Sequence, residues 1–159
     1  MDVHNPLFWH QGLFLQPQHF QLLERSIATQ LSPLLRYPCP HLWGIRRVEV
    51  HEAALNNRSF QILSGEFLFP DGSFVVFPGN ASLEARSFDE DWVEGGKPLT
   101  VYLGLKKWDS KNKNVSVLPG LEGASQSNTR FVAPTNPEEV PDLHEGKDPA
   151  LVKKLSYVL

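Results

Sequence analysis

The spacing of the hydrophobic residues changes near residue 43 and divides the chain into a helical part and a β-rich part. Ahead of that point, four apolar residues recur at intervals of three and four: Phe20, Leu23, Ile27 and Leu31. This spacing gives an α-helix one apolar face. Pro17 suits the first position of a helix, where its missing N–H costs no hydrogen bond. We therefore predict a helix that begins at Pro17 and ends at Pro33.

In the second part the apolar residues alternate with polar ones, as they do in a half-buried β-strand. A strand with a bulge is predicted for residues 45–50, and another strand for residues 60–69. Pro70-Asp71-Gly72-Ser73 is a turn signature, because proline presets φ and glycine tolerates a positive φ. Phe74-Val75-Val76-Phe77 is then the returning strand of a hairpin.

Further strands are predicted in the last third of the chain. One segment alternates cleanly, with Tyr102 on the opposite face from Leu99, Val101, Leu103 and Leu105. Residues 115–118 are predicted to pair with it across a turn at residues 111–113, and residues 152–159 are predicted to form a final strand. Residues 120–128 and 133–149 are rich in turn formers and acids, which indicates long loops or extended arms.

The composition favours a β fold. Thirteen Pro and eleven Gly in 159 residues leave little room for long helices. A parallel sheet would need crossover connections, usually helices, between its strands, and only one strong helix is predicted. We therefore expect a mainly β fold, an antiparallel β-sandwich with one N-terminal amphipathic α-helix.

Charge and cysteine content exclude several classes of protein. A net charge of −3 and a pI near 6.0 argue against a dedicated nucleic-acid binder. The single cysteine cannot form an internal disulfide. The charge-free residues 3–23 contain glutamines, histidines and two prolines, so they fit neither a bilayer span nor a signal peptide. We expect a cytoplasmic protein without direct membrane insertion.

No group of residues in the sequence supports catalysis. Cys39 lies between two prolines, whose rigidity separates it from His41. The six histidines include no H-x-x-x-H pair that would hold a metal from one helix face. His19 falls in the first helical turn, where an imidazole can bond backbone groups. We expect no enzyme activity, no catalytic residue, no metal and no cofactor.

Apolar residues gather ahead of the helix, in a segment interrupted by Pro6 and Gly12. They are Leu7, Phe8, Trp9, Leu13, Phe14 and Leu15. They either cover the core of their own chain or form an arm, residues 1–16, that packs on another subunit or partner, since large apolar patches often mark interfaces. In the second case Trp9 and Phe14 are the candidate anchors, because aromatic side chains concentrate interface energy. The helix and sandwich then occupy residues 17–159.

The same segment resembles a known family. The run from Trp9 to Gln21 reads W-H-Q-G-L-F-L-Q-P-Q-H-F-Q and includes Gly12, Pro17, Gln18, His19, Phe20 and Gln21. It resembles the N-terminal signature W-x-E-G-M-x-L-x-P-Q-H-F-Q of the TssK family of type VI secretion baseplate proteins, with Gln11 in place of Glu and Leu13 in place of Met.

Three later motifs extend the resemblance in the same order. Trp43-Gly44-Ile45 is similar to the W-G-hydrophobic segment of the family. Gly65 followed by Pro70-Asp71-Gly72-Ser73-Phe74 resembles its G…P-D-G-T-x-F hairpin, with Ser in place of Thr. Arg130-Phe131 resembles a later R-Y pair.

The resemblance implies a structural role. TssK-like proteins are trimers that link the TssF–TssG wedge to TssL and TssM, and their N-terminal part resembles the β-sandwich shoulder of phage receptor-binding proteins. We expect an N-terminal fragment of such a protein, at a baseplate docked on the bacterial inner membrane. It would contact TssF–TssG and copies of itself, and would reach TssL/TssM only through a C-terminal domain absent here. The alternative is a carbohydrate- or receptor-binding sandwich in which Trp43, Trp92 and Trp108 stack on sugars.

Overall fold

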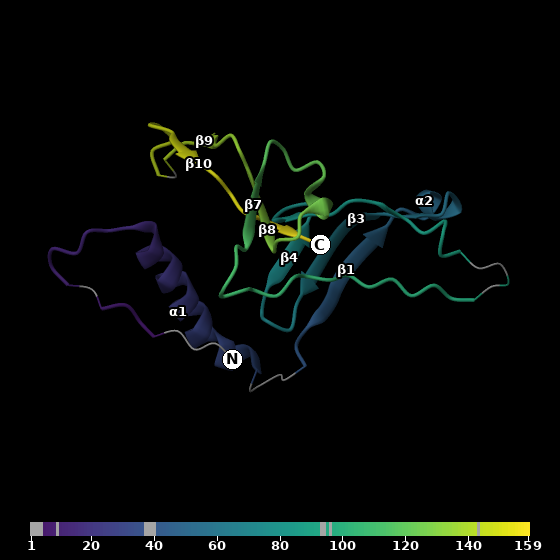
Figure 1. The fold of residues 1–159 in the computed structure, drawn as a ribbon, viewed down its shortest axis with the longest axis horizontal. Helices are drawn as coiled ribbons and strands as arrows, with labels where there is room; N and C mark the ends of the chain where they lie inside the picture. The colour runs from purple at the N-terminus through teal and green to yellow at the C-terminus, as the bar shows by residue number, and fades with distance from the viewer. Residues whose placement is uncertain (1–4, 9, 37–40, 93–94, 96, 143) are drawn as a thin grey trace.

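Two β-sheets share one hydrophobic core and form the body of the molecule (Figure 1). The structure is a computed structural model that describes residues 5–8, 10–36, 41–92, 95, 97–142 and 144–159. One sheet has the strand order β1-β3-β4, with β1 at Gly44–Val50, β3 at Ile62–Leu68 and β4 at Phe74–Phe77. The other has the order β5-β11-β8-β7, with β5 at Ala81–Ser82, β11 at Ser156–Val158, β8 at Phe131–Pro134 and β7 at Val115–Leu118.

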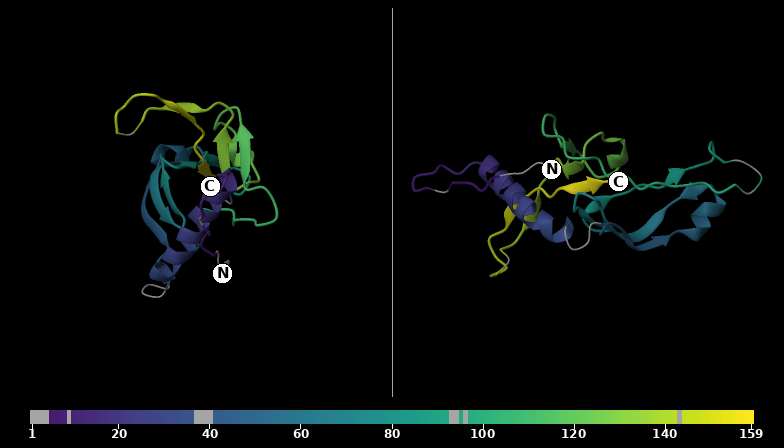
Figure 2. Two further views of the ribbon diagram at one scale, coloured as in Figure 1. Left: turned by 90° about the vertical axis from the view of Figure 1, so that its left-hand side faces the viewer. Right: turned by 90° about the horizontal axis from the view of Figure 1, so that it is seen from below.

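Smaller elements connect these sheets or project from them. The short helix α2 (Glu52–Asn56) follows β1, and β2 (Ser59–Phe60) pairs with β6 (Arg86–Ser87). A 3₁₀ turn, η1 (Ala124–Gln126), lies between β7 and β8. The hairpin of β9 (Glu138–Val140) and β10 (Ala150–Val152) projects away from the sheets (Figures 1 and 2).

The predicted mainly β fold with one long helix is confirmed. The hairpin β3–β4 forms across residues 70–73 as the sequence indicated. Most ladders are antiparallel, but β7 pairs with β8, and β5 with β11, in parallel. The connection from β7 to β8 is the dozen-residue loop that contains η1, which is long enough to return a parallel strand.

A bulge in β3 brings its core residues onto one face. The β1–β3 register skips Arg46 on β1, where the bulge was predicted, and Leu63 on β3. Because an extra residue inverts the alternation of side chains, Ile62 and Phe67 face the same core although their positions differ in parity. That core also holds Val75 and Ala81, so both sheets contribute to it.

The predicted end of the N-terminal helix was wrong. Helix α1 spans Pro17–Arg36 and contains Pro33. A proline in the last turn removes only one backbone hydrogen bond, and its fixed φ suits a helix. The helix can therefore continue beyond it for three further residues.

The predicted strand at residues 99–105 was also wrong. Among the described residues this segment is extended but joins no ladder, and its expected partner β7 pairs with β8 instead. Leu103 and Leu105, two of the alternating apolar residues, pack against the core without being part of a strand. The final strand predicted for residues 152–159 forms only in part. Ser156–Val158 is β11, which pairs with β5 and β8, whereas Val152 is the last residue of β10, which pairs with β9.

Candidate interaction site

The apolar arm predicted for residues 1–16 lies on the surface of the chain. Phe8 is 83% exposed and Phe14 is 80% exposed, while Leu15 is about half exposed and Leu7 and Leu13 are half-buried. Trp9 falls outside the described residues. Gly12 has a φ of 84° in a turn closed by the Leu13 N–H and the His10 carbonyl. This left-handed conformation favours glycine, so Gly12 sets the direction of the arm.

His19 fixes the start of α1 directly behind the arm. The N–H of Gln16 donates to Nδ1 of His19 at 3.1 Å, and the N–H of His19 donates to the carbonyl of Gln16 at 3.0 Å. The first bond requires an unprotonated Nδ1. A side chain in the first turn that returns to the cap residue is the geometry of a capping box. Pro17 begins the helix, and Gln18 and Gln21 are exposed on it.

The apolar face of α1 points away from the rest of the described chain. Among its described side chains, four of the five exposed large apolar residues fall within a narrow stripe of the helical wheel, namely Phe20, Ile27, Leu31 and Leu34, whereas Leu22 lies on the opposite side. Ser26, on another side of the helix, is almost fully buried, and its hydroxyl donates to the Leu23 carbonyl at 2.9 Å. The helix lies at one end of the molecule with the arm beyond it (Figure 1). Arm and stripe are therefore neighbouring apolar surfaces.

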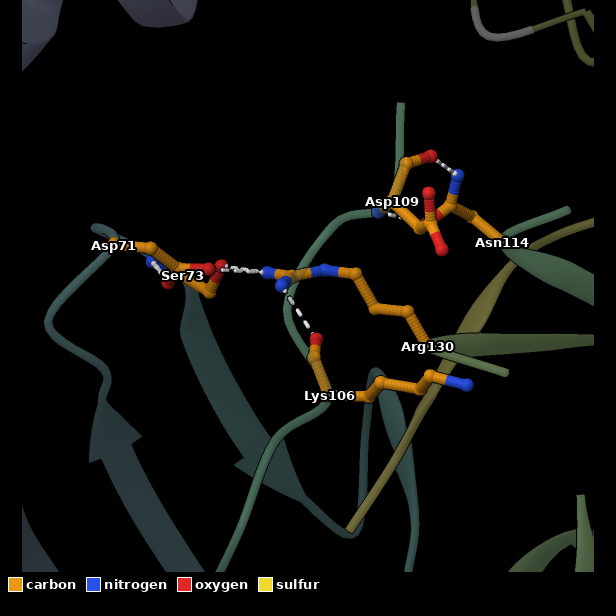
Figure 3. Close-up of polar contacts among 6 residues, drawn as sticks. All are labelled: Asp71, Ser73, Lys106, Asp109, Asn114 and Arg130. Carbon is orange, nitrogen blue, oxygen red and sulfur yellow. Dashed lines mark hydrogen bonds and ion pairs between the residues drawn. The ribbon is translucent and has the colours of Figure 1, made fainter. Parts of the chain in front are cut away.

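Two of the sequence motifs meet in an ion pair whose arginine is buried (Figure 3). The Arg130 side chain is 5% exposed, and its Nη2 lies 2.8 Å from Oδ2 of Asp71 in the β3–β4 turn. Arg130 also donates to the Ser73 hydroxyl and, at 2.8 Å, to the Lys106 carbonyl. The guanidinium also lies over two aromatic rings, 5.6 Å from the centroid of Phe131 and 5.5 Å from that of Tyr157. Arg130 therefore joins the β3–β4 turn to the second sheet.

The turn itself is held by Asp71 and Gly72. The N–H of Ser73 donates to Oδ1 of Asp71 at 3.0 Å, and Gly72 takes a φ of 87°. Partial burial raises the pKa of Asp71, but the hydrogen bonds from Ser73 and the charge of Arg130 outweigh it, so this pKa lies below its usual value of 3.8. Pro70 is exposed at the start of the turn.

We predict that Asp71 contributes to the acid sensitivity of the fold. Because its pKa is lower in the folded chain, the unfolded chain binds the proton first as the pH falls. The stabilisation is complete above about pH 4 and is lost progressively below it. Urea unfolding of the parent and of Asp71→Asn at pH 6 and near pH 3 should show a smaller loss in the variant. An equal loss in both proteins would contradict this role.

A tight loop follows the extended segment 97–107. The Oδ1 of Asn114 accepts the Asp109 N–H at 2.8 Å, and its amide donates to the Asp109 carbonyl at 2.7 Å (Figure 3). The Asp109 carboxylate accepts from Asn112 and from the Lys111 N–H, and these hydrogen bonds lower its pKa. The loop thus has a defined shape, and several lysines lie on it.

The three tryptophans considered for sugar stacking lie in different surroundings. The Arg25 guanidinium lies 4.4 Å from the centroid of the Trp108 ring, and Arg58 lies 5.7 Å from that of Trp92. Each of these contacts covers one face of an indole ring. Trp43 is more than half exposed and precedes Gly44, whose φ of 138° favours glycine at the start of β1.

Among the described residues, no three His, Cys, Asp or Glu side chains lie close enough to share a metal ion. An open cavity of about 380 Å³ lies between β7 and residues 123–129, lined in part by Ser116, Ser127 and Thr129. In the same part of the chain, no helix is both long and apolar enough to cross a bilayer. Cys39 lies outside the described residues.

Comparisons with known proteins point in one direction. Residues 19–159 match the family described as "Bacterial Type VI secretion, VC_A0110, EvfL, ImpJ, VasE". The chain is 30% identical over 105 residues to the type VI secretion system baseplate component TssK1 of Pseudomonas aeruginosa, a match that covers 66% of this chain and 23% of TssK1.

Solved structures show the same fold. A chain of the TssK-TssF-TssG baseplate subcomplex, determined by cryo-electron microscopy, matches 98% of this chain with a TM-score of 0.71 and 19% identity. A crystal structure of TssK matches 97% with a TM-score of 0.73 and 17% identity. This chain covers 49% and 33% of those two chains, so it spans half or less of the relatives that it resembles.

Proposed function

This chain belongs to the TssK (ImpJ/VasE) family of bacterial type VI secretion proteins, and we propose that it is a structural baseplate subunit that docks on a TssF–TssG wedge. The observation that carries the proposal is the family match over residues 19–159. The likeness to a TssK-TssF-TssG subcomplex supports the choice of partner. The sequence motifs had predicted the family, and the family match confirms it.

We assign the docking surface to the arm, residues 1–16, together with the apolar stripe of α1. Phe8 and Phe14 expose most of their rings, and the stripe from Phe20 to Leu34 faces away from the core. Exposed apolar side chains that gather in one part of a protein often mark an interaction surface. The helix and sandwich, from Pro17 to Leu159, would hold this surface in position.

A TssK-like protein would also link the wedge to TssL and TssM. We assign that link to the parts of the relatives that this chain does not span. It covers 33% of the TssK chain in the crystal structure. We therefore place contacts with TssL and TssM outside this domain. On the same family grounds, we place the domain at a baseplate on the cytoplasmic face of the inner membrane.

We predict that shortening the arm side chains weakens wedge binding. Phe8→Ser with Phe14→Ser should lower the affinity for purified TssF–TssG from the same bacterium at least tenfold, because aromatic anchors often contribute about 1.4 kcal/mol or more to an interface. Biolayer interferometry with immobilised TssF–TssG measures this change.

A matched control distinguishes the loss of arm contacts with TssF–TssG from a general loss of exposed apolar surface. Val117→Ser with Leu121→Ser also removes two exposed apolar side chains, but from β7 and the loop that follows it. This control should bind within about twofold of the parent, which is a change of about 0.4 kcal/mol. Equal binding by the parent, the control and a folded arm variant would contradict the assignment of the arm.

A further inference from the structure

Four lysines gather around the Asp109 loop. They are Lys106, Lys107, Lys111 and Lys113. Lys106 donates to the neutral carbonyl and side-chain oxygens of Asn128, and the Asp109 carboxylate is bonded by Asn112 and the Lys111 N–H. Within the described part of the chain, none of the four ammonium groups makes an ion pair. With only Asp109 to oppose them, this segment is strongly basic.

The β9–β10 hairpin carries the opposite charge. Its strands and connecting loop hold five acidic residues between positions 138 and 148, namely Glu138, Glu139, Asp142, Glu145 and Asp148, against the single basic residue Lys147. Glu138 forms an ion pair with Lys154. Its two strands pair with each other and with no other described strand. The hairpin projects into solvent (Figures 1 and 2), and Leu151 on β10 is largely exposed.

The extended residues 97–107 lead into the basic loop and present an open backbone edge. Leu103 and Leu105 hold this segment against the core, while Leu99, Val101 and Tyr102 are exposed. The Lys106 carbonyl accepts from Arg130, whereas residues 97–105 join no ladder with any described strand. An extended chain whose N–H and C=O groups are not paired in a ladder is a template for the edge of another strand.

We propose that the acidic β9–β10 hairpin of one copy of this chain docks along residues 97–113 of a second copy. The two surfaces are opposite in charge, and each offers exposed apolar side chains and an unpaired strand edge. No ion pair joins them within the described residues of one chain. Both halves of the contact are present in every copy, which favours self-association over a foreign partner.

An anionic membrane is the other natural acceptor for a lysine cluster. Lipid headgroups would use the four charges but neither the open backbone edge nor the exposed Leu99, Val101 and Tyr102. The hairpin would remain unexplained. The contact joins two different surfaces and is heterologous, so it builds either a closed ring or an open chain of subunits. It involves neither the arm nor the wedge and is independent of the proposed docking function.

Charge reversal in both surfaces tests this contact. Glu139→Lys with Glu145→Lys, or Lys107→Glu with Lys111→Glu, should each raise the dissociation constant for self-association at least tenfold at 50 mM NaCl in sedimentation equilibrium. The quadruple variant should return to within about threefold of the parent. The parent should dissociate in 1 M NaCl, where the Debye length is about 3 Å.

Two controls complete the experiment. Arg47→Glu with Arg86→Glu reverses two exposed charges on β1 and β6, and should leave self-association unchanged. Circular dichroism establishes that every variant is folded. A monomeric parent at low salt would overturn the proposal, as would a quadruple variant that remains dissociated. The parent could also bind phosphatidylserine vesicles. If Lys107→Glu/Lys111→Glu abolished that binding without changing self-association, the lysines would be assigned to lipid and the proposal would be overturned. TssF–TssG binding, measured separately, reports on the proposed function.

Discussion

Replacing Asp71 by alanine should lower the free energy of unfolding by about 3 kcal/mol, because it leaves the buried Arg130 guanidinium without a carboxylate partner. Arg130 is 5% exposed, whereas the Asp71 side chain is 45% exposed. Water can therefore solvate Asp71 when Arg130 is removed, but cannot solvate Arg130 when Asp71 is removed. We expect Arg130→Met to cost less than Asp71→Ala.

The double variant makes this prediction specific to the ion pair. In Asp71→Ala/Arg130→Met no charge remains buried, so its cost should be less than the sum of the two single variants. Urea unfolding followed by tryptophan fluorescence at pH 7 gives all four free energies. Additive single variants, or Asp71→Ala within about 0.5 kcal/mol of the parent, would show that the pair does not join the two sheets as described.

Replacing Gly65 by alanine should cost about 2 kcal/mol of stability, because the new Cβ would overlap a core ring. A Cβ built on Gly65 lies 2.3 Å from Cζ of Phe67, and Phe67 is only 3% exposed. Gly65 and Phe67 lie on the same face of β3, so the ring covers the glycine. The ring has little space into which it can move.

Gly104 provides a matched control for this substitution. A Cβ at Gly104 meets no atom within 4 Å, so Gly104→Ala should change the free energy of unfolding by less than about 0.5 kcal/mol. Phe67→Leu should recover part of the loss when combined with Gly65→Ala, because it removes ring atoms from the overlap. Thermal unfolding of the four proteins measures this, and equal stability of the two alanine variants would contradict the packing.

Local sequence patterns predicted the elements that depend on interactions between residues close together in the chain. The helix start at Pro17, the β3–β4 hairpin and the bulge after Ile45 depend on turn chemistry and short-range spacing, and all three form. The Leu63 bulge could not be foreseen, because it is set by the pairing of β3 with β1. Of the alternating apolar residues at 99–105, only Leu103 and Leu105 pack against the core. A ladder also requires a neighbouring strand with free backbone groups.

The role of Arg130 shows a different limit of the sequence. Both Arg130-Phe131 and the Pro70–Phe74 hairpin were visible as separate motifs, but nothing along the chain indicated that they meet. The fold brings together residues almost sixty positions apart and makes the ion pair structural. The sequence also could not predict whether the apolar stripe of α1 faces the core or solvent, because periodicity identifies an apolar face without showing what it contacts.

If this chain is a wedge-docking domain of a baseplate subunit, as we propose, it should form a complex with TssF–TssG in solution. Size-exclusion chromatography with light scattering, on a mixture of this chain and purified TssF–TssG from the same bacterium, tests it most directly. We expect a single peak whose mass equals TssF–TssG plus bound copies of the chain. Separate peaks for the folded chain and for an intact TssF–TssG complex would contradict it.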